Sequence, residues 1–391
     1  MKPPKFKLSQ ICDITMGQAP KGSSYNDVNE GYPLIAGAGD FGVKTPKPKK
    51  HTVKPTRLSA NGDLILCIRA TIGDLNWSDN QYCLGRGVAG LRPISNKLDK
   101  NYLWHFLQFY KEELQKKGTG STFKQISRSH IEEIEVPLPP LQEQKRIAAI
   151  LDKADAVRRK RQQAIELSEQ LLRSVFLDMF GDPVTNPKGW QVKKLQEVCL
   201  KITDGVHQKP TYSEEGVPFI SVKDITTGKL SFDNCKFISK EDHVKYFKRC
   251  NPEWLDVLYT KVGATYGRPA LVTTHEEFSL YVSVALIKPN KNLINPYFLK
   301  ETLASPAIKH QADRSIKGIG VPDLHLIEIK SFLIAVPPMK VQDEFVKKAK
   351  KIINKVNLQN NSLIQLNNLF SSLTQKAFSG ELSKHLNTAL V

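Results

Sequence analysis

The chain has 391 residues, 40% of them hydrophobic, so it is long enough for two or three domains with buried cores. Lys and Arg number 57 against 39 Asp and Glu, and the formal net charge of +18 is typical of proteins that bind DNA, RNA or an anionic membrane. No run reaches the ~18 apolar residues of a spanning helix. No apolar signal core follows the first residues, so we expect a cytoplasmic protein that binds no membrane. A protein that is merely basic is the plain alternative.

The sequence contains the same plan twice. Six segments return in the same order: Leu8–Cys12 as Leu195–Cys199, Ile14–Gly17 as Ile202–Gly205, Gly31–Ile35 as Gly216–Ile220, Ala70–Gly73 as Ala264–Gly267, Pro139-Pro140 as Pro337-Pro338, and Phe180 as Phe378. From Pro139 onward the spacing between the copies is constant at 198 residues. An ordered series of matches indicates an internal repeat, and we predict copies over roughly residues 1–181 and 182–391.

Each copy begins with a globular part, over residues 1–138 and 182–336. Asp63–Ile68 and Leu280–Ile287 are short, apolar and rich in strand formers, and turn residues separate such segments. Short helices are expected over Tyr102–Lys116 and Pro296–Ala304. The pattern predicts an α+β or mostly β module with many loops, and for the whole chain we predict an α+β fold.

Each copy ends with a long helix, over residues 139–181 and 337–391. A proline pair suits the start of a helix and not its interior. No further Pro or Gly occurs until Gly181 in the first copy and Gly380 in the second. Forty residues of helix would span ~60 Å.

The two helices carry matched apolar stripes at alternating steps of four and three residues, the spacing of a coiled coil. In the second helix nine of ten positions are apolar: Phe345, Ala349, Ile352, Val356, Gln359, Leu363, Leu366, Phe370, Leu373 and Ala377. In the first, seven of ten are apolar: Ile147, Leu151, Ala154, Arg158, Arg161, Ile165, Ser168, Leu172, Val175 and Met179.

We interpret the stripes as the seam of an antiparallel helix pair, with the equivalent polar residues Gln359 and Arg161 fixing its register. The alternative is two separate amphipathic helices, each packed on its own globular domain. A rigid pair would hold two modules at a fixed distance, and duplex DNA presents the same face after ~34–36 Å.

Two motifs resemble catalytic sites but lack the required context. Gly37–Gly42 matches a GxGxxG nucleotide fingerprint, yet Val43–Lys50 contains two prolines where the motif needs a helix. Asp323, Glu328 and Lys330 resemble a metal-dependent nuclease signature, but only four residues separate the two acids, and we expect Ile329, like Ile131, to be strand or turn core. The six cysteines form no CxxC pair, so we expect no metal site and no disulfide framework, only small buried residues.

Basic residues gather in the loops of both globular parts, where they would contact DNA phosphates and base edges. In the first part the candidates are Lys44, Lys47, Lys49, Lys50, Lys54, Arg57, Arg69, Arg86 and Lys124. In the second they are His207, Gln208, Lys209, Tyr212, Lys261, Tyr266, Arg268, Arg314 and Lys317. A solvated basic loop is the alternative for the first group.

Ile134–Ile147, which leads through Leu151–Asp155 into a long charged helix, is similar to a motif of the specificity subunits of type I restriction-modification systems. Ile334–Gln342 is a weaker second copy. The resemblance covers the whole chain. It implies two target-recognition domains in pseudo-twofold repeat, separated by two long antiparallel coiled-coil helices, which bind a bipartite asymmetric site on double-stranded DNA.

The resemblance also implies a chain without catalysis. Two methyltransferase subunits would dock on it, restriction subunits could join, and S-adenosylmethionine, ATP and Mg would act on those partners. Val341 and Glu344 stand where the first copy has Glu143 and Arg146, which would make the two docking sites unequal. The rival hypotheses are a nuclease or methyltransferase with an unrecognised site, and an RNA-binding or scaffold protein.

Overall fold

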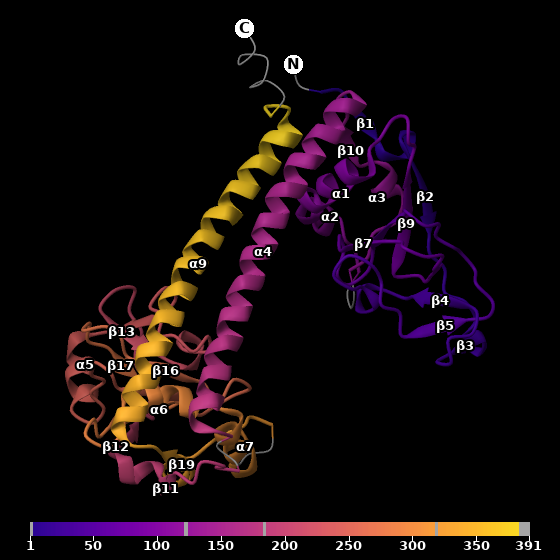
Figure 1. The fold of residues 1–391 in the computed structure, drawn as a ribbon. Helices are drawn as coiled ribbons and strands as arrows, with labels where there is room; N and C mark the ends of the chain where they lie inside the picture. Colours follow the sequence, from indigo (N-terminus) through magenta and orange to yellow (C-terminus); the bar gives the residue numbers. More distant parts are fainter. Residues whose placement is uncertain (1–2, 121–123, 183–184, 317–319, 383–391) are drawn as a thin grey trace. The chain divides into compact units, whose positions relative to one another are not determined.

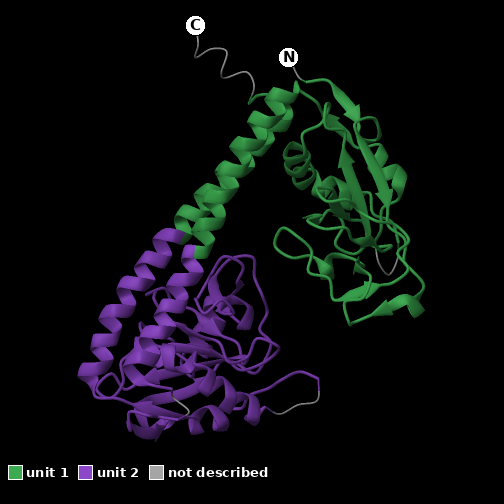
Figure 2. Ribbon diagram, turned by 45° about the vertical axis from the view of Figure 1, so that its right-hand side comes forward, with its two compact units in different colours: residues 1–163, 360–391 green, residues 164–359 purple. Residues whose placement is uncertain are grey.

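The computed structural model describes residues 3–120, 124–182, 185–316 and 320–382. The chain forms two compact units, one of residues 1–163 with 360–391 and one of residues 164–359 (Figure 2). Helix α4 (Leu141–Phe180) and helix α9 (Met339–Ser379) both pass from one unit to the other. Each unit therefore contains one globular domain, the start of one long helix and the end of the other.

The globular domain of unit 1 is built on two four-stranded sheets and a two-stranded one (Figure 1). The antiparallel central sheet has the order β2-β9-β6-β7, the mixed sheet has the order β3-β5-β4-β8, and β1 pairs with β10. The strands are β1 (Lys5–Lys7), β2 (Cys12–Met16), β3 (Tyr25–Asn26), β4 (Tyr32–Ile35), β5 (Lys50–Thr52), β6 (Leu64–Cys67), β7 (Leu75–Trp77), β8 (Cys83–Leu84), β9 (Val88–Pro93) and β10 (Glu135–Pro137).

The helices of this domain are α1 (Lys100–Phe109), α2 (Lys111–Lys116) and α3 (Arg128–Glu132), with short 3-10 turns at Leu8–Gln10, Gly22–Ser24 and Ala38–Asp40. The helix expected over Tyr102–Lys116 is therefore two helices, which meet at Tyr110. Within unit 1, the β1–β10 pair lies beside the start of α4, and the sheet with β4 and β5 lies at the opposite end of the domain (Figure 1).

Unit 2 repeats this plan. Its central sheet has the order β12-β18-β15-β16, β13 pairs with β14 and β17, and β11 pairs with β19. The elements are β11 (Gln191–Lys194), β12 (Cys199–Asp204), β13 (Val217–Ile220), β14 (Lys236–Ile238), α5 (Lys240–Phe247), β15 (Val257–Thr260), β16 (Pro269–Leu271), β17 (Ser279–Leu280), β18 (Val284–Pro289), α6 (Pro296–Leu303), α7 (Pro306–Ser315), α8 (Leu326–Ser331) and β19 (Leu333–Val336), with 3-10 turns at Leu195–Val198 and Val222–Asp224.

The repeat predicted from the sequence is therefore a repeat of fold, because matching strands take matching places in the two central sheets. Two expectations are corrected. Leu280–Ile287 is not one strand, because a turn separates β17 from β18. Ile131 and Ile329 are fully buried, as expected of core residues, but they lie in the short helices α3 and α8 rather than in strands or turns.

Each long helix is fixed to its own globular domain by one buried glutamine near its start. The side-chain oxygen of Gln144 accepts a hydrogen bond from the Asp99 backbone N–H at 2.8 Å, and its amide nitrogen donates to the carbonyls of Lys97 and Pro139, both at 2.9 Å. Gln342, 198 residues later, repeats the pattern with Asn295 N, Leu293 O and Pro337 O at 2.8, 3.3 and 2.7 Å. A buried amide with its groups satisfied fixes both partners in place.

Each globular core is completed by the end of the other helix. In unit 1, Phe378 of α9 packs against Tyr102 and Phe106 of α1, with ring centroids 5.3 Å apart in both pairs. In unit 2, Phe180 of α4 packs against Phe298 of α6 at 4.7 Å and against Phe345 of α9 at 5.3 Å. The start of one helix thus lies beside the end of the other in each unit, so the helices pair antiparallel.

The predicted seam coincides with the covered side of both helices. All twenty seam positions are buried or half-buried, including the polar ones. Gln359 is 8% exposed, and its Oε1 atom lies 3.4 Å from the hydroxyl of Ser168 on α4. Arg161 is half-buried, and on the same helix the guanidinium of Arg158 lies over the ring of Phe370 at 4.5 Å.

Burial also decides the state of the cysteines. All six are among the described residues and are free thiols, and five are buried. Burial raises the pKa of Cys12 and Cys250 to about 12, so both stay protonated at neutral pH. In the part of the chain that the structure describes, no helix is long and apolar enough to cross a membrane.

Replacing Phe345 by Ala should lower the free energy of unfolding of the full chain by ~3–5 kcal/mol. The ring is fully buried where α9 packs against the end of α4, so its removal leaves a cavity. Denaturant unfolding measures this change. Leu358→Ala, on the same helix but 71% exposed, is the control and should change stability by less than ~0.5 kcal/mol. Equal losses in the two variants would contradict the packing described for α4 and α9.

Candidate nucleic-acid interface

The most concentrated positive charge of unit 1 lies in the basic loop, which we define as residues 43–57. All six of its Lys and Arg residues are exposed: Lys44, Lys47, Lys49, Lys50, Lys54 and Arg57. No Asp or Glu occurs from Phe41 to Gly62. Lys50 belongs to β5, so the basic loop runs at the end of the domain that lies away from the start of α4 (Figure 1).

The basic loop is held by its backbone, which leaves its charged groups free to bind a ligand. The carbonyl of Lys44 accepts a hydrogen bond from the Trp77 N–H at 2.7 Å, and the Lys47 N–H donates to the Asp40 carbonyl at 2.7 Å. Elsewhere in the unit, cations face carboxylates, as in Arg92–Asp63 at 2.7 Å. Among the described residues, none of the six basic side chains of the loop lies within 4.0 Å of a carboxylate.

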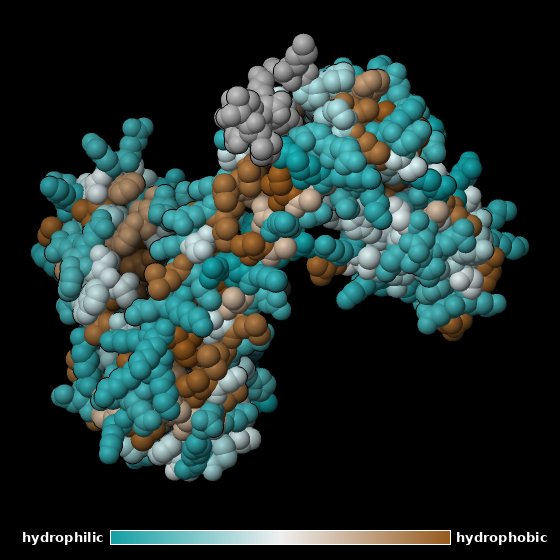
Figure 3. Space-filling model, turned by 45° about the horizontal axis from the view of Figure 1, so that its top comes forward, coloured by the Kyte–Doolittle hydropathy of each residue, from teal (hydrophilic) through white to brown (hydrophobic). Residues whose placement is uncertain are grey.

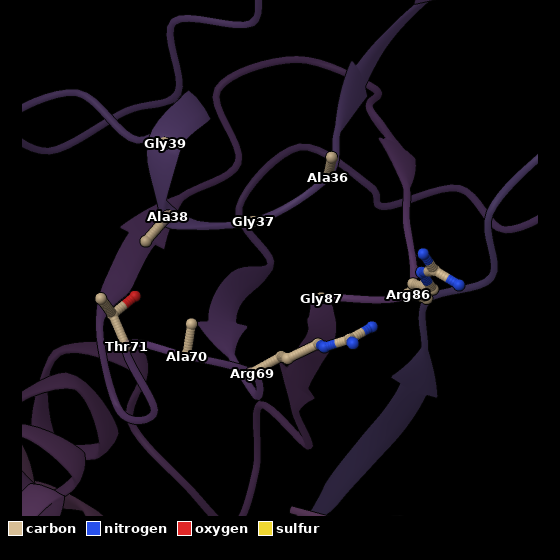
Figure 4. Close-up of a pocket in the computed structure, with 9 residues that line it drawn as sticks. All are labelled: Ala36, Gly37, Ala38, Gly39, Arg69, Ala70, Thr71, Arg86 and Gly87. Atoms are coloured by element: carbon tan, nitrogen blue, oxygen red, sulfur yellow. The ribbon is translucent and has the colours of Figure 1, made fainter. Parts of the chain in front are cut away.

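An open depression of about 460 Å³ lies in the same domain (Figure 4). Three segments line it: Ala36–Gly39 after β4, Arg69–Thr71 after β6, and Arg86–Gly87 before β9. In Figure 4 the side chain of Arg69 extends in the direction of Arg86. Arg86 is exposed and Arg69 half-buried. Two guanidinium groups in one depression suit a phosphate or the O6 and N7 acceptors of guanine.

Glycine lets a ligand approach the backbone of this depression. A Cβ at Gly37 or Gly39 would meet no atom within 4 Å, so nothing covers the main chain there. At Gly87 a Cβ would lie 2.2 Å from the Ala36 carbonyl oxygen, so the close approach of these two segments requires glycine. The GxGxxG segment therefore contributes open backbone, and only the 3-10 turn Ala38–Asp40 follows Gly37, where a nucleotide fold has a helix.

Lys124 belongs to the same region. It is exposed, and its carbonyl accepts a hydrogen bond from the N–H of Ala70, which lines the depression, at 3.0 Å. The next residue, Gln125, forms an isolated bridge with Arg69. The structure thus brings Arg69 and Arg86 together in one depression, and the backbone of Lys124 lies beside its lining.

The candidates of unit 2 divide by exposure. Lys209, Tyr212, Arg268 and Arg314 are exposed, as are His207 and Gln208, whereas Lys317 lies outside the described residues. Lys261 is corrected: its side chain is only 7% exposed, and its Nζ atom lies 3.5 Å from Asp204 and 3.8 Å from Asp323. A buried, paired ammonium does not present its charge to DNA.

Tyr266 is half-buried and its hydroxyl is engaged. It donates a hydrogen bond to Asp313, and the ammonium of Lys309 lies 3.9 Å from the centre of its ring. Hydrogen bonds from Lys309 and then from Tyr266 hold the pKa of Asp313 below its usual value, so this carboxylate is ionised at neutral pH. Contact of the Tyr266 hydroxyl with DNA would first require the loss of this bond.

Sequence reasoning missed two kinds of residue. Gln144 and Gln342 escaped notice because a lone glutamine has no pattern, although their 198-residue spacing was a usable signal. Arg249 was missed because it follows α5 (Lys240–Phe247) within a stretch without a recognised counterpart in the first copy; its guanidinium lies 3.0 Å from the buried Asp204.

Comparison with known proteins finds one family. The family model described as "Type I restriction modification DNA specificity domain" matches residues 4–167 and 187–368. The specificity subunit of the type I restriction enzyme EcoBI from Escherichia coli is 26% identical over 97% of this chain and 86% of that protein. The putative MjaX specificity subunit from Methanocaldococcus jannaschii is 36% identical over 42% of this chain, but the match spans only 39% of that protein.

Solved structures show the same fold. The type I restriction-modification S subunit from M. genitalium matches with a TM-score of 0.58 and 17% identity, over 97% of this chain and 99% of that one. A chain from a study of complex assembly and conformational transition of the type I R-M system matches with a TM-score of 0.56 and 18% identity, over 97% and 98%.

Replacing Lys47, Lys49 and Lys50 of the basic loop by Gln should weaken DNA binding and flatten its salt dependence. Each lost phosphate contact lowers the slope of log K against log salt by ~0.9, so three contacts change it by ~2.7. Fluorescence anisotropy from 50 to 200 mM salt measures the slope. The control replaces Lys5, Lys7 and Lys116, which face carboxylates, and has the same net charge. The same slope in both triple variants would remove the basic loop from the interface.

Proposed function

The chain belongs to the type I restriction-modification DNA specificity domain family and is a DNA-recognition subunit without catalysis of its own, and from that premise we propose that its two globular domains read the two halves of a split, asymmetric DNA sequence. The observation that supports this proposal is one fold present twice with different loop chemistry. The central sheets have the same strand order, β2-β9-β6-β7 and β12-β18-β15-β16. Identical loops on these sheets would favour a symmetric site, and different loops favour an asymmetric one.

The loop chemistry differs at matching places. The first domain has the unpaired basic loop and a depression with two arginines. The second domain has the buried Lys261 and Asp204 with Arg249, and its exposed candidate cations lie in separate loops and on helix α7, which holds Arg314. Each domain therefore presents its own set of donors to DNA, while phosphate contacts supply the common part of the affinity.

We propose that the long helices also dock two methyltransferase subunits. Single exposed apolar residues are normal on protein surfaces, but here several lie outside the seam of the two helices: Val157, Leu167, Leu171, Leu177, Leu358, Ile364 and Leu369. Leu171 and Leu369 occupy equivalent positions and are 52% and 54% exposed. Figure 3 shows a mostly hydrophilic face with hydrophobic patches between hydrophilic side chains.

The two docking sites are unequal in this proposal. At the start of α4, Glu143 and Arg146 form a bidentate ion pair with contacts of 2.6 and 2.7 Å. At the start of α9, Val341 packs against the core of unit 2, and Glu344 pairs with Lys348 at 3.3 Å. Charged residues set the preference for a partner, so we expect the two copies of the methyltransferase to bind with different affinity.

The chemistry of the system lies on the partner chains in this proposal. S-adenosylmethionine would supply the methyl group for adenine in the methyltransferase subunits, and ATP and Mg would serve cleavage in restriction subunits where these join. This chain supplies the sequence preference and the surface on which they assemble. It would act in the cytoplasm, on double-stranded DNA.

Co-expression of this chain with the methyltransferase subunit of its own system should place methyladenine at one split motif with a fixed gap. Genome-wide mapping of methyladenine measures the outcome and gives both half-sites. Methylation at a single continuous motif, or at none although the two chains associate, would contradict the proposal. In the second case, preferential binding of structured RNA over duplex DNA would support the RNA-binding alternative.

Leu171→Asp and Leu369→Asp should each remove one methyltransferase copy, so that two copies per chain fall to one, because a buried unpaired carboxylate is costly at an interface. Native mass spectrometry counts the copies. Leu200→Asp is the matched control, since Leu200 is 72% exposed and belongs to β12 rather than to a long helix. Retention of two copies in both helix variants would place the docking surface elsewhere.

A further inference from the structure

The second globular domain has a buried ion pair where the first has apolar residues. Asp204 is the last residue of β12, and its counterpart at the end of β2 is Met16. Lys261 follows β15, and its counterpart after β6 is Ile68. The backbone supports this match, because Lys261 N donates to Ser283 O at 3.0 Å and Ile68 N donates to Gly87 O at 2.9 Å.

Three further side chains, those of Arg249, His207 and Asp323, surround the buried pair. Oδ1 of Asp204 lies 3.0 Å from a guanidinium nitrogen of Arg249 and 3.3 Å from Nε2 of His207. Its Oδ2 lies 3.5 Å from the ammonium of Lys261, which lies 3.8 Å from Asp323. Asp204 thus organises three basic groups, of which only Lys261 is buried.

Stability does not account for this arrangement. The desolvation of two charges often exceeds their attraction, and apolar residues of similar volume commonly serve at least as well. The first domain demonstrates this alternative in the same fold, with Met16 and Ile68 at the two positions. A charged cluster in a place where the fold accepts apolar residues points to a use of the charges themselves.

The side chains of the cluster that reach the surface are those of Arg249 and His207. Their side chains are 54% and 62% exposed, whereas that of Asp204 is 3% exposed. The carbonyl of Arg249 accepts a hydrogen bond from Lys201 at 2.7 Å, so its backbone is also fixed. One end of the guanidinium is held by the buried carboxylate, and because the side chain is 54% exposed, its other N–H donors can bind a phosphate or a guanine edge.

The cluster lies at the end of the central sheet that corresponds to the depression of the first domain. Gly87, the counterpart of Ser283, lines that depression. An isolated bridge joins Arg69 to Gln125 there, and the corresponding bridge in the second domain joins Val262 to Asp323. The two domains therefore present different basic groups at the same place of the same fold.

We propose that Asp204 is a positioning residue that holds Arg249 and His207 in place for contact with duplex DNA at the second half-site. The inference rests on the proposed function and adds to it. It makes Lys261 a buried partner of this carboxylate and adds Arg249 to the DNA-contacting residues. In the first domain, Arg69 and Arg86 occupy the corresponding region.

The test uses the full chain in complex with its methyltransferase subunits, and DNA in which one half-site is scrambled at a time. Asp204→Asn removes a negative charge, which by charge alone would strengthen DNA binding. We expect the opposite, a loss of roughly 5- to 100-fold, confined to DNA that contains the second half-site. Arg249→Gln should give a similar loss. The double variant should bind no worse than the weaker single one, because both changes remove the same contact.

Asp256→Asn is the matched control. Asp256 is a buried carboxylate at the opposite end of β15, where it accepts a hydrogen bond from Lys288 at 2.7 Å, and burial raises its pKa. This variant should lose thermal stability and keep its DNA affinity.

Unchanged or stronger binding by Asp204→Asn, additive losses in the double variant, or an equal loss in Asp256→Asn would each overturn the positioning role. A wild-type complex that prefers no split site would instead overturn the proposed function, and this inference with it.

Discussion

The joint between each long helix and its globular domain depends on one buried glutamine. Gln144 and Gln342 each bind one N–H and one carbonyl of the segment just before a domain helix. Each also binds the carbonyl of the first proline of the pair that precedes the long helix. Because these groups are buried, breaking the joint would leave several polar groups without partners, at ~1–3 kcal/mol each. A domain attached in this way cannot rotate freely about its helix. Such a rigid attachment is required if two DNA-reading domains are to be held at a fixed spacing.

The exchange of helix ends makes the two halves of the sequence dependent on each other. Phe378 belongs to the second copy by sequence but packs in the core of the first domain, and Phe180 does the reverse. Neither copy therefore contains all the apolar side chains of its own core. This exchange also explains why the compact units divide each long helix, although the sequence assigns a whole helix to each copy. The helix pair is thus part of both cores, and its seam and its ends are stabilised by the same burial.

Sequence reasoning succeeded where the signal is periodic or repeated. The proline pairs and the heptad stripe predicted the long helices, which the structure shows as Leu141–Phe180 and Met339–Ser379. It was wrong where tertiary packing decides. Lys261 reads as a surface cation, because nothing local indicates that Asp204, 57 residues earlier, is buried beside it. No Pro or Gly in the sequence marks the break at Tyr110 between α1 and α2, so the sequence gives no sign of it. The residues that would recognise DNA lie mostly in loops. The geometry of a loop depends on tertiary contacts, and no periodic pattern in the sequence indicates these.

The two domains illustrate how one fold can carry two specificities. The strand order, the buried glutamines and the aromatic ends of the helices are the same in both copies, and each is needed for packing. The positions at the ends of the central strands are different, with Met16 and Ile68 in one domain and Asp204 and Lys261 in the other. The fold accepts either pair at these positions, because strand pairing depends on the backbone, and the charged pair brings Arg249 and His207 together at the surface. The residues that would recognise DNA can therefore change at these strand ends while the residues that join the domains to the helices stay the same. Because each domain has its own strand ends, the preference for one half-site can change independently of the preference for the other.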